Sequence, residues 1–205
     1  MAFLGTSGNE DKNVYFVKIQ GLKKGSDKVY FEVQKKDAEG NYVIVATPWG
    51  LKGNLDNIKV EKFQYDGQEQ TKFKLVMSSE DDLYFLTLGN NKISRTIFNC
   101  LASAELIGEI SMGLYNNDKG YPAIWVKNDG EKLDWKYSLD ELNKKVDVQE
   151  MKNGKKIYDA SELEEFFEKE VVKNITSKLS PKMEQPKPVA SQEEEEEDDD
   201  DQLPF

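Results

Sequence analysis

Aromatic residues and a lysine share the face of one expected strand that points away from the core. Ile124 and Val126 alternate on one face of this strand, so Tyr121, Trp125 and Lys127 fall on the opposite face. Aromatic rings can stack on unpaired nucleobases, and lysines can pair with the phosphates between them. This strand therefore carries a candidate platform for single-stranded nucleic acid.

The same alternation marks further candidate contacts to bases and phosphates. Tyr30 faces away from the aliphatic side of its strand, and Trp49 lies in a loop between a proline and a glycine. Lys59 and Phe63 share a face unless a bulge separates them. The complete set of candidate DNA-binding residues is Tyr30, Trp49, Lys59, Phe63, Lys72, Lys74, Tyr115, Tyr121, Trp125 and Lys127. Each aromatic residue could instead belong to the core or to a sheet edge, and each lysine could simply be solvated.

The composition argues against several classes of catalytic site. The chain has no histidine and a single cysteine, which excludes zinc sites built on His or Cys and any Ser-His or Cys-His arrangement. That cysteine, Cys100, lies in an apolar helical pattern and is expected to be a core thiol in a reducing compartment. Metal chemistry using carboxylates alone stays open, although no isolated pair of acids stands out in a folded segment. We expect a protein that is not an enzyme and needs neither cofactor nor metal.

The last fifteen residues, 191–205, hold most of the excess negative charge. The whole chain has 28 basic and 39 acidic side chains and a net charge of −11, and this segment contributes nine acids and no base. Residues 1–190 therefore carry 28 bases and 30 acids, a balance of −2. Nine adjacent carboxylates repel one another, so an extended, disordered tail is expected.

The tail ends in an apolar tripeptide that follows the acidic run and Gln202. Its proline restricts the backbone and lowers the entropy lost on docking. An apolar tip beside acids and a terminal carboxylate suits a hydrophobic pocket ringed by Lys and Arg. The candidate partner-binding residues are Asp198, Asp199, Asp200, Asp201, Leu203, Pro204 and Phe205.

This ending resembles the acidic tip of single-stranded DNA-binding proteins from bacteria and their phages, which end in several aspartates, an aliphatic residue, proline and phenylalanine. It departs from that pattern in the intervening Gln202 and in the use of Leu203 where isoleucine is usual. The match covers under a tenth of the chain. The resemblance implies a tail that recruits replication and repair proteins, such as a polymerase, primase, helicase or recombinase.

The body alternates short apolar segments with turn sequences, which indicates a mainly β domain with minor α. Strands are expected at residues 14–20, 28–35, 42–47, 57–65, 71–77, 83–88, 107–115 and 121–127, and one more at 133–137. The run Pro48-Trp49-Gly50 is expected to end the third of them. A helix capped by Asn90 or Asn91 follows the strand at 83–88. This order fits a five-stranded OB-fold barrel with an extra N-terminal hairpin; an SH3-like barrel or an unclosed sheet also fits.

The segment 138–180 is expected to form an extension on this barrel. Ser138 caps a short helix, Asn153-Gly154 makes a hairpin turn, and Ser161 with Glu164 caps a second helix. The second helix must bury a stripe against the barrel or a second subunit, formed by Leu163, Phe166, Phe167, Val171, Ile175 and Leu179. The expected organisation is an OB-like barrel over residues 1–137, the extension over 138–180, and a linker with the acidic tail over 181–205.

The favoured hypothesis is a non-enzymatic protein that coats single-stranded DNA without strong sequence preference during replication, recombination or repair. The tail is expected to fold back on the lysine-lined groove until DNA displaces it. Without a membrane-spanning apolar run or a signal-peptide pattern, the protein is expected in the cytoplasm, that of a bacterial host if a phage encodes it. The alternative is an acidic protein-interaction module, such as a chaperone or a DNA-mimicking inhibitor. A carboxylate-metal nuclease is a weaker third hypothesis, and a homo-oligomer is left open.

Overall fold

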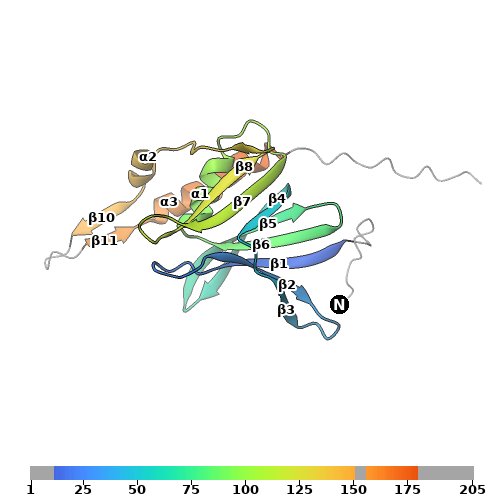
Figure 1. Cartoon of the computed structure of the whole chain (residues 1–205). Coiled ribbons are helices and arrows are strands. Elements are labelled where there is room, and N and C mark those ends of the chain that lie inside the picture. Colours follow the sequence, from blue (N-terminus) through green and yellow to red (C-terminus); the bar gives the residue numbers. More distant parts are fainter. Residues whose placement is uncertain (1–11, 151–155, 180–205) are drawn as a thin grey trace, which may run out of the picture.

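The computed structural model describes residues 12–150 and 156–179. Within these residues the protein is mainly β: nine strands form one sheet in the order β3-β2-β1-β6-β5-β4-β7-β8-β9 (Figure 1), and β10 pairs with β11. The strands are β1 (Asn13–Gln20), β2 (Tyr30–Lys36), β3 (Tyr42–Ala46), β4 (Gly50–Tyr65), β5 (Gln68–Ser78), β6 (Asp82–Gly89), β7 (Glu109–Asn116), β8 (Pro122–Asn128), β9 (Glu131–Lys132), β10 (Asp147–Glu150) and β11 (Lys156–Asp159). The helices are α1 (Lys92–Leu101), α2 (Leu139–Asn143), α3 (Ser161–Phe166) and α4 (Val172–Thr176), with the π-helical turn η1 (Phe167–Val171) between the last two.

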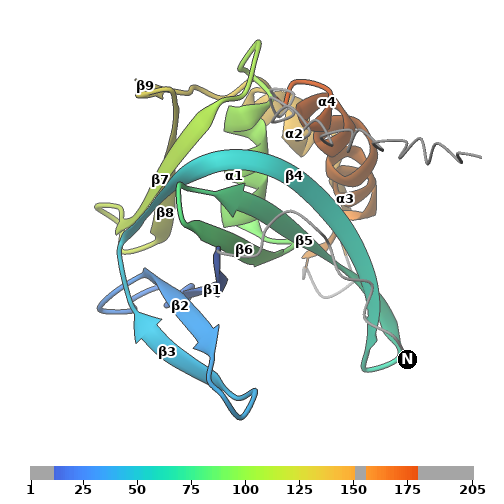
Figure 2. The same ribbon diagram turned by 90° about the vertical axis from the view of Figure 1, so that its right-hand side faces the viewer.

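The long strand β4 sets the curvature of the sheet. Its first residues pair with β7, and its remainder pairs with β5, with a register shift between Leu55 and Asn57. A bulge of this kind bends its strand and increases the local twist. Figure 2 shows the result, an arch that runs from β7 at one end to the β4–β5 turn at the other. The two ends of β4 therefore present their side chains in different directions.

The sheet does not close into a barrel within the described residues. β3 and β9 are its two end strands, and they are not paired with each other. The N-terminal hairpin β1–β2 joins the sheet through a parallel pairing of β1 with β6, and the other strand pairs are antiparallel. The mainly β class with few helices is thus confirmed, whereas the closed OB barrel expected from the strand order is not shown.

The core lies on one side of the strands, as the side-chain alternation predicts. Phe73, Leu75 and Met77 of β5 are buried, and so are Ile124 and Val126 of β8. The expected cap of α1 is confirmed as well: Asn91 forms a capping box with Ser94, in which each side chain bonds the other residue's backbone N–H. Phe98 of this helix then packs edge-on against Phe73, with ring centroids 4.7 Å apart.

The C-terminal helical segment α3–η1–α4 completes the same core. Leu163, Phe167, Val171 and Ile175 are buried with residues of α1 and the sheet, so this chain itself buries most of the predicted stripe. The helix start differs from the expected one. The N-cap is Ala160, without a side-chain cap, and Ser161 donates both its backbone N–H and its hydroxyl to Asp159. The prediction of a Ser161–Glu164 capping box was therefore wrong.

The strands differ from expectation most at the start of β4 and at residues 133–137. β4 begins at Gly50, directly after Trp49, rather than at residue 57, because pairing with β7 extends the strand backwards. The segment 133–137 is not a strand; β9 covers only Glu131–Lys132. The side-chain pattern of a single segment does not predict either difference, because each depends on which neighbouring strand is available for pairing.

Several predictions fall outside the described residues. The Asn153-Gly154 turn between β10 and β11 is one of them, and the linker and acidic tail at 180–205 are another. In the part of the chain that is described, no helix has both the length and the apolar character needed to cross a membrane.

Candidate nucleic-acid interface

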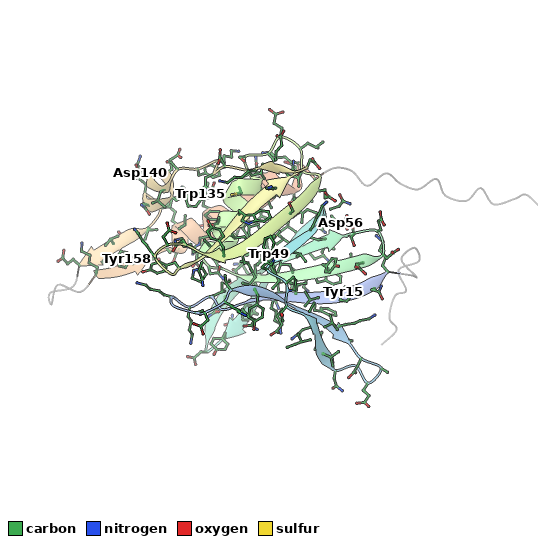
Figure 3. The ribbon with its side chains drawn as sticks, in the orientation of Figure 1. Tyr15, Trp49, Asp56, Trp135, Asp140 and Tyr158 are labelled. Carbon is green, nitrogen blue, oxygen red and sulfur yellow. The ribbon has the colours of Figure 1, made fainter. Side chains whose placement is uncertain are left out.

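Trp49 is held by backbone hydrogen bonds to two strands that are distant in sequence. The carbonyl of Pro48 accepts from the N–H of Phe31 in β2, and the carbonyl of Trp49 accepts from the N–H of Leu114 in β7, each at 2.8 Å. The indole itself is 64% exposed. In Figure 3 it lies near the middle of the molecule. The backbone at Trp49 is therefore held in place, and the indole ring stays accessible to a ligand.

Trp125 lies across the backbone of β7. It is paired with Gly113, and a Cβ atom at that glycine would come within 2.4 Å of the indole. Only glycine leaves room for the ring in this position. The centroids of Trp125 and Trp49 are 6.2 Å apart with their planes at 60°, and the Lys127 ammonium lies 5.5 Å from the Trp125 ring. The geometry brings two aromatic faces and a cation together, as base stacking beside a phosphate requires.

A groove of about 660 Å³ opens beside Trp125. We call it the tryptophan groove; it is lined by Lys92, Ile93, Thr96 and Cys100 of α1, by Tyr115, by residues 122–127 of β8, and by Lys132, Leu133, Asp134 and Trp135. The segment carrying Trp135 is anchored at both ends, by Leu133 N–H to the Val126 carbonyl (3.0 Å) and Lys136 N–H to the Asn99 carbonyl (3.2 Å). Figure 3 shows Trp135 on the α1 side of the molecule.

A second hollow continues from the tryptophan groove. This Tyr30 cavity, of about 570 Å³, is lined by residues 27–30, 47–49 and 115–116. Tyr115 lines both hollows, and Trp49 lines the second while contacting Trp125 of the first. Five predicted residues from three strands and one loop are thus brought to one continuous surface: Tyr30, Trp49, Tyr115, Trp125 and Lys127.

Tyr121 lies at the margin of this surface. It is exposed, and the Lys24 ammonium sits 4.6 Å from its ring centroid. The loop carrying Lys24 is attached to the β7–β8 turn, since Gly25 N–H donates to the Gly120 carbonyl at 3.1 Å and the Asn116 amide donates to the Ser26 carbonyl at 2.9 Å. Lys24 and Tyr121 therefore form a second lysine-aromatic pair, which adds a positive charge at the margin of the surface.

The other four predicted residues, Lys59, Phe63, Lys72 and Lys74, lie elsewhere. They occupy the β4–β5 pair, beyond the part of β4 that pairs with β7 (Figure 2). Glu61 lies among them and forms ion pairs with Lys74 (2.9 Å) and Lys72 (3.2 Å). These contacts, the Lys74 hydrogen bond first, lower the pKa of Glu61, so the carboxylate stays charged and offsets part of the positive charge. The structure does not join these four residues to the tryptophan groove.

Sequence reasoning missed several residues of the interface. Trp135, Lys132 and Lys92 line the groove, and Gly113 makes room for Trp125. The Asp129-Gly130 turn before Lys132 was a usable signal, because a tight hairpin there returns the chain beside Lys127, and Lys127 does pair with Lys132. Lys92 had no such signal, since its place depends on how α1 packs on β8.

Cys100 of α1 lines the groove, and the reactivity of its thiol measures how far the side chain is buried. The side chain is buried, and desolvation raises the pKa of the thiol to about 11 from an ordinary value of 9.0. Because the thiolate is the reactive form, native protein at pH 8 should react with a disulfide reagent roughly 100-fold more slowly than urea-unfolded protein. The measurement is the rate of thiol modification. Cys100→Ala supplies the blank, since the chain has one cysteine. Equal native and unfolded rates would contradict the burial.

Comparison of the chain with protein-family models, curated proteins and solved structures finds no match. Among the described residues, no group of three or more carboxylate or thiol side chains is arranged to hold a metal ion.

Proposed function

We propose that this protein binds single-stranded DNA, or another single-stranded nucleic acid, without strong sequence preference. The observation that carries the proposal is the position of the three tryptophans of the chain. Trp125 and Trp135 line one groove, and Trp49 contacts Trp125 where the groove meets the Tyr30 cavity. Stacking on such rings is tolerant of base identity because every base has a π face.

The distribution of charge supports the same proposal. Lys92, Lys127 and Lys132 line the groove, and Asp134 is the one acid among its lining residues that are described. Lys24 lies beside Tyr121, and the Tyr30 cavity is lined by one base, Lys28, and one acid, Asp27. A surface that is locally basic on a body of balance −2 can attract phosphates, and the attraction should weaken as salt is added.

The order of elements supports an OB-related architecture for this binding domain. β4, β5 and β6 are followed by α1 and then by the β7–β8 hairpin, which is the five-stranded order with a helix between the third and fourth strands. OB folds are partly open barrels that commonly bind single strands. In this proposal β1, β2 and β3 are an addition that continues the sheet from β6 instead of closing it.

The tail completes the proposed function. Its nine carboxylates compete with phosphates for the lysines of the interface, and DNA binding releases Leu203, Pro204 and Phe205 to replication or recombination proteins. The support is the charge difference between tail and interface together with the likeness of the tip to that of bacterial and phage single-stranded DNA-binding proteins. The competition is electrostatic, so it is strongest at low salt.

Fluorescence polarisation with labelled oligo(dT) tests both parts. Full-length protein should bind tightly and with strong salt dependence, and a chain of residues 1–190 should bind more tightly still, most clearly at low salt. Equal affinities of the two chains at low salt would refute tail competition while leaving DNA binding intact. Binding by neither chain would refute the proposal and favour an acidic protein-interaction module.

A further inference from the structure

A third hollow lies beside the Tyr30 cavity and shares Pro48 with it. This cavity of about 450 Å³, which we call the tyrosine cavity, is lined by Tyr15, Val33, Lys35, Val45, Ala46, Pro48, Gly50, Leu51, Lys52 and Tyr84. Pro48 lines both this cavity and the Tyr30 cavity, and the tyrosine cavity takes in the residues on either side of Trp49. Pro48 therefore lies between the two hollows, and the ring of Trp49 lines the Tyr30 cavity beside it.

Two tyrosines form an aromatic wall in this cavity. The rings of Tyr15 in β1 and Tyr84 in β6 are stacked, with centroids 5.3 Å apart and planes inclined by 19°. Both are half-buried and rest against the core. The hydroxyl of Tyr84 donates to Asp82 at 2.9 Å, which fixes the direction of its ring. Burial and this carboxylate raise the pKa of Tyr84 to about 12, so the hydroxyl stays neutral at physiological pH.

Two lysines accompany the tyrosines. The Lys35 ammonium lies 5.8 Å from the Tyr15 ring centroid and donates to the Asn13 side chain at 2.9 Å. Lys52 is paired with Glu109 at 2.9 Å, and both side chains are largely exposed. An exposed ion pair contributes little stability, so Lys52 can exchange Glu109 for a phosphate at small cost. The cavity thus combines a stacked aromatic wall with two cations, the same pairing found at Trp125.

We infer that the tyrosine cavity is an additional nucleobase site, in which a single strand passing over Trp49 places a base against Tyr15 and Tyr84 and a phosphate beside Lys35 or Lys52. This inference rests on the proposed function and extends it. The strand follows a path from the tryptophan groove, past Trp49 in the Tyr30 cavity and over Pro48, into the tyrosine cavity. The N-terminal hairpin β1–β2, which supplies Tyr15 and Lys35, becomes part of the binding surface.

The test is an affinity series over oligo(dT) of increasing length, from roughly 4 to 20 nucleotides, the range of sites that single OB folds cover. Tyr15→Leu and Lys35→Ala should leave the affinity for the shortest bound oligomers unchanged. For longer oligomers, which reach the cavity, Tyr15→Leu should weaken binding by roughly 5- to 150-fold, the loss of one stacked base. Tyr15→Phe keeps the ring and should bind as the wild type does. Trp125→Ala should weaken binding at every length.

Photocrosslinking gives a readout that does not depend on a substituted protein. Oligo(dT) carrying 5-iododeoxyuridine is irradiated with the full-length protein, and the modified peptides are identified by mass spectrometry. Adducts on Tyr15 or Tyr84 are expected alongside those on Trp49. Two results together would overturn the inference and leave the proposed function standing: adducts confined to the tryptophans, and an affinity of Tyr15→Leu equal to that of the wild type at every oligomer length. No binding of any oligomer by the wild type would instead overturn the proposed function.

Discussion

Replacing Trp125 with alanine should weaken binding of oligo(dT) by roughly 5- to 150-fold, which corresponds to about 1–3 kcal/mol for one lost stacking contact. The ring lies on the backbone of Gly113, 6.2 Å from Trp49 and 5.5 Å from the ammonium of Lys127. It is held in place before any ligand arrives, so little entropy is lost when a base stacks on it. The measurement is a polarisation titration at one fixed salt concentration.

A matched control and a second variant make this prediction specific. Tyr158→Ala removes an aromatic ring that is 66% exposed on β11, outside the interface, and should leave the affinity unchanged. Gly113→Ala keeps every aromatic ring of the chain but puts a methyl group where the Trp125 indole lies, so it should weaken binding in the same direction as Trp125→Ala. Wild-type affinity in both Trp125→Ala and Gly113→Ala would show that nucleic acid does not use this groove.

Replacing Phe167 with alanine should lower the free energy of unfolding by about 3–5 kcal/mol, the usual cost of removing a fully buried aromatic ring. Phe167 is 0% exposed and packs in the core shared by α1, the sheet and the C-terminal helical segment. Its loss leaves a cavity at the junction of these elements, where the surrounding side chains have little room to collapse. Urea unfolding of the full-length chain measures the effect through the transition midpoint.

The preceding residue supplies the control for this second prediction. Phe166 is half-buried, with its ring edge-on to Tyr137 at 5.0 Å and under the Lys145 ammonium at 4.7 Å. Phe166→Ala should therefore cost less than Phe167→Ala, although the two changes are chemically identical and adjacent. If Phe167→Ala left the midpoint unchanged, the C-terminal helix would be a detachable appendage rather than a part of the core.

Much of the local structure could be predicted because it depends on neighbours in sequence. The alternation in β5 and β8 identified Phe73, Leu75, Ile124 and Val126 as core residues, since the side-chain period of a strand is two. The Asn91 cap was equally predictable, because a capping side chain bonds to backbone groups two and three residues away. The Ser161 cap failed because Asp159, also close in sequence, competes for the same N–H and hydroxyl.

The candidate site was predicted only in part. The alternation of side chains along a strand placed Trp125 and Lys127 on the outer face. It could not show that Lys59 and Lys74 face another direction. That separation comes from the length and bend of β4, which depend on its pairing with β7 at one end and with β5 at the other. Trp135 was taken for part of a strand, because its position depends on hydrogen bonds from its segment to β8 and α1.

The sequence by itself determined the mainly β class, the core-facing side chains, the helix between β6 and β7, and the concentration of negative charge at 191–205. These properties follow from composition and from interactions within a few residues. The tertiary structure alone decided that the sheet stays open within the described residues, that β1 pairs with β6 in parallel, and that the ring of Trp49 contacts that of Trp125. The physical reason is that each depends on backbone bonds between distant segments. The backbone carbonyl of Pro48 accepts a hydrogen bond from Phe31, and that of Trp49 accepts one from Leu114. No local sequence pattern encodes this choice of partners.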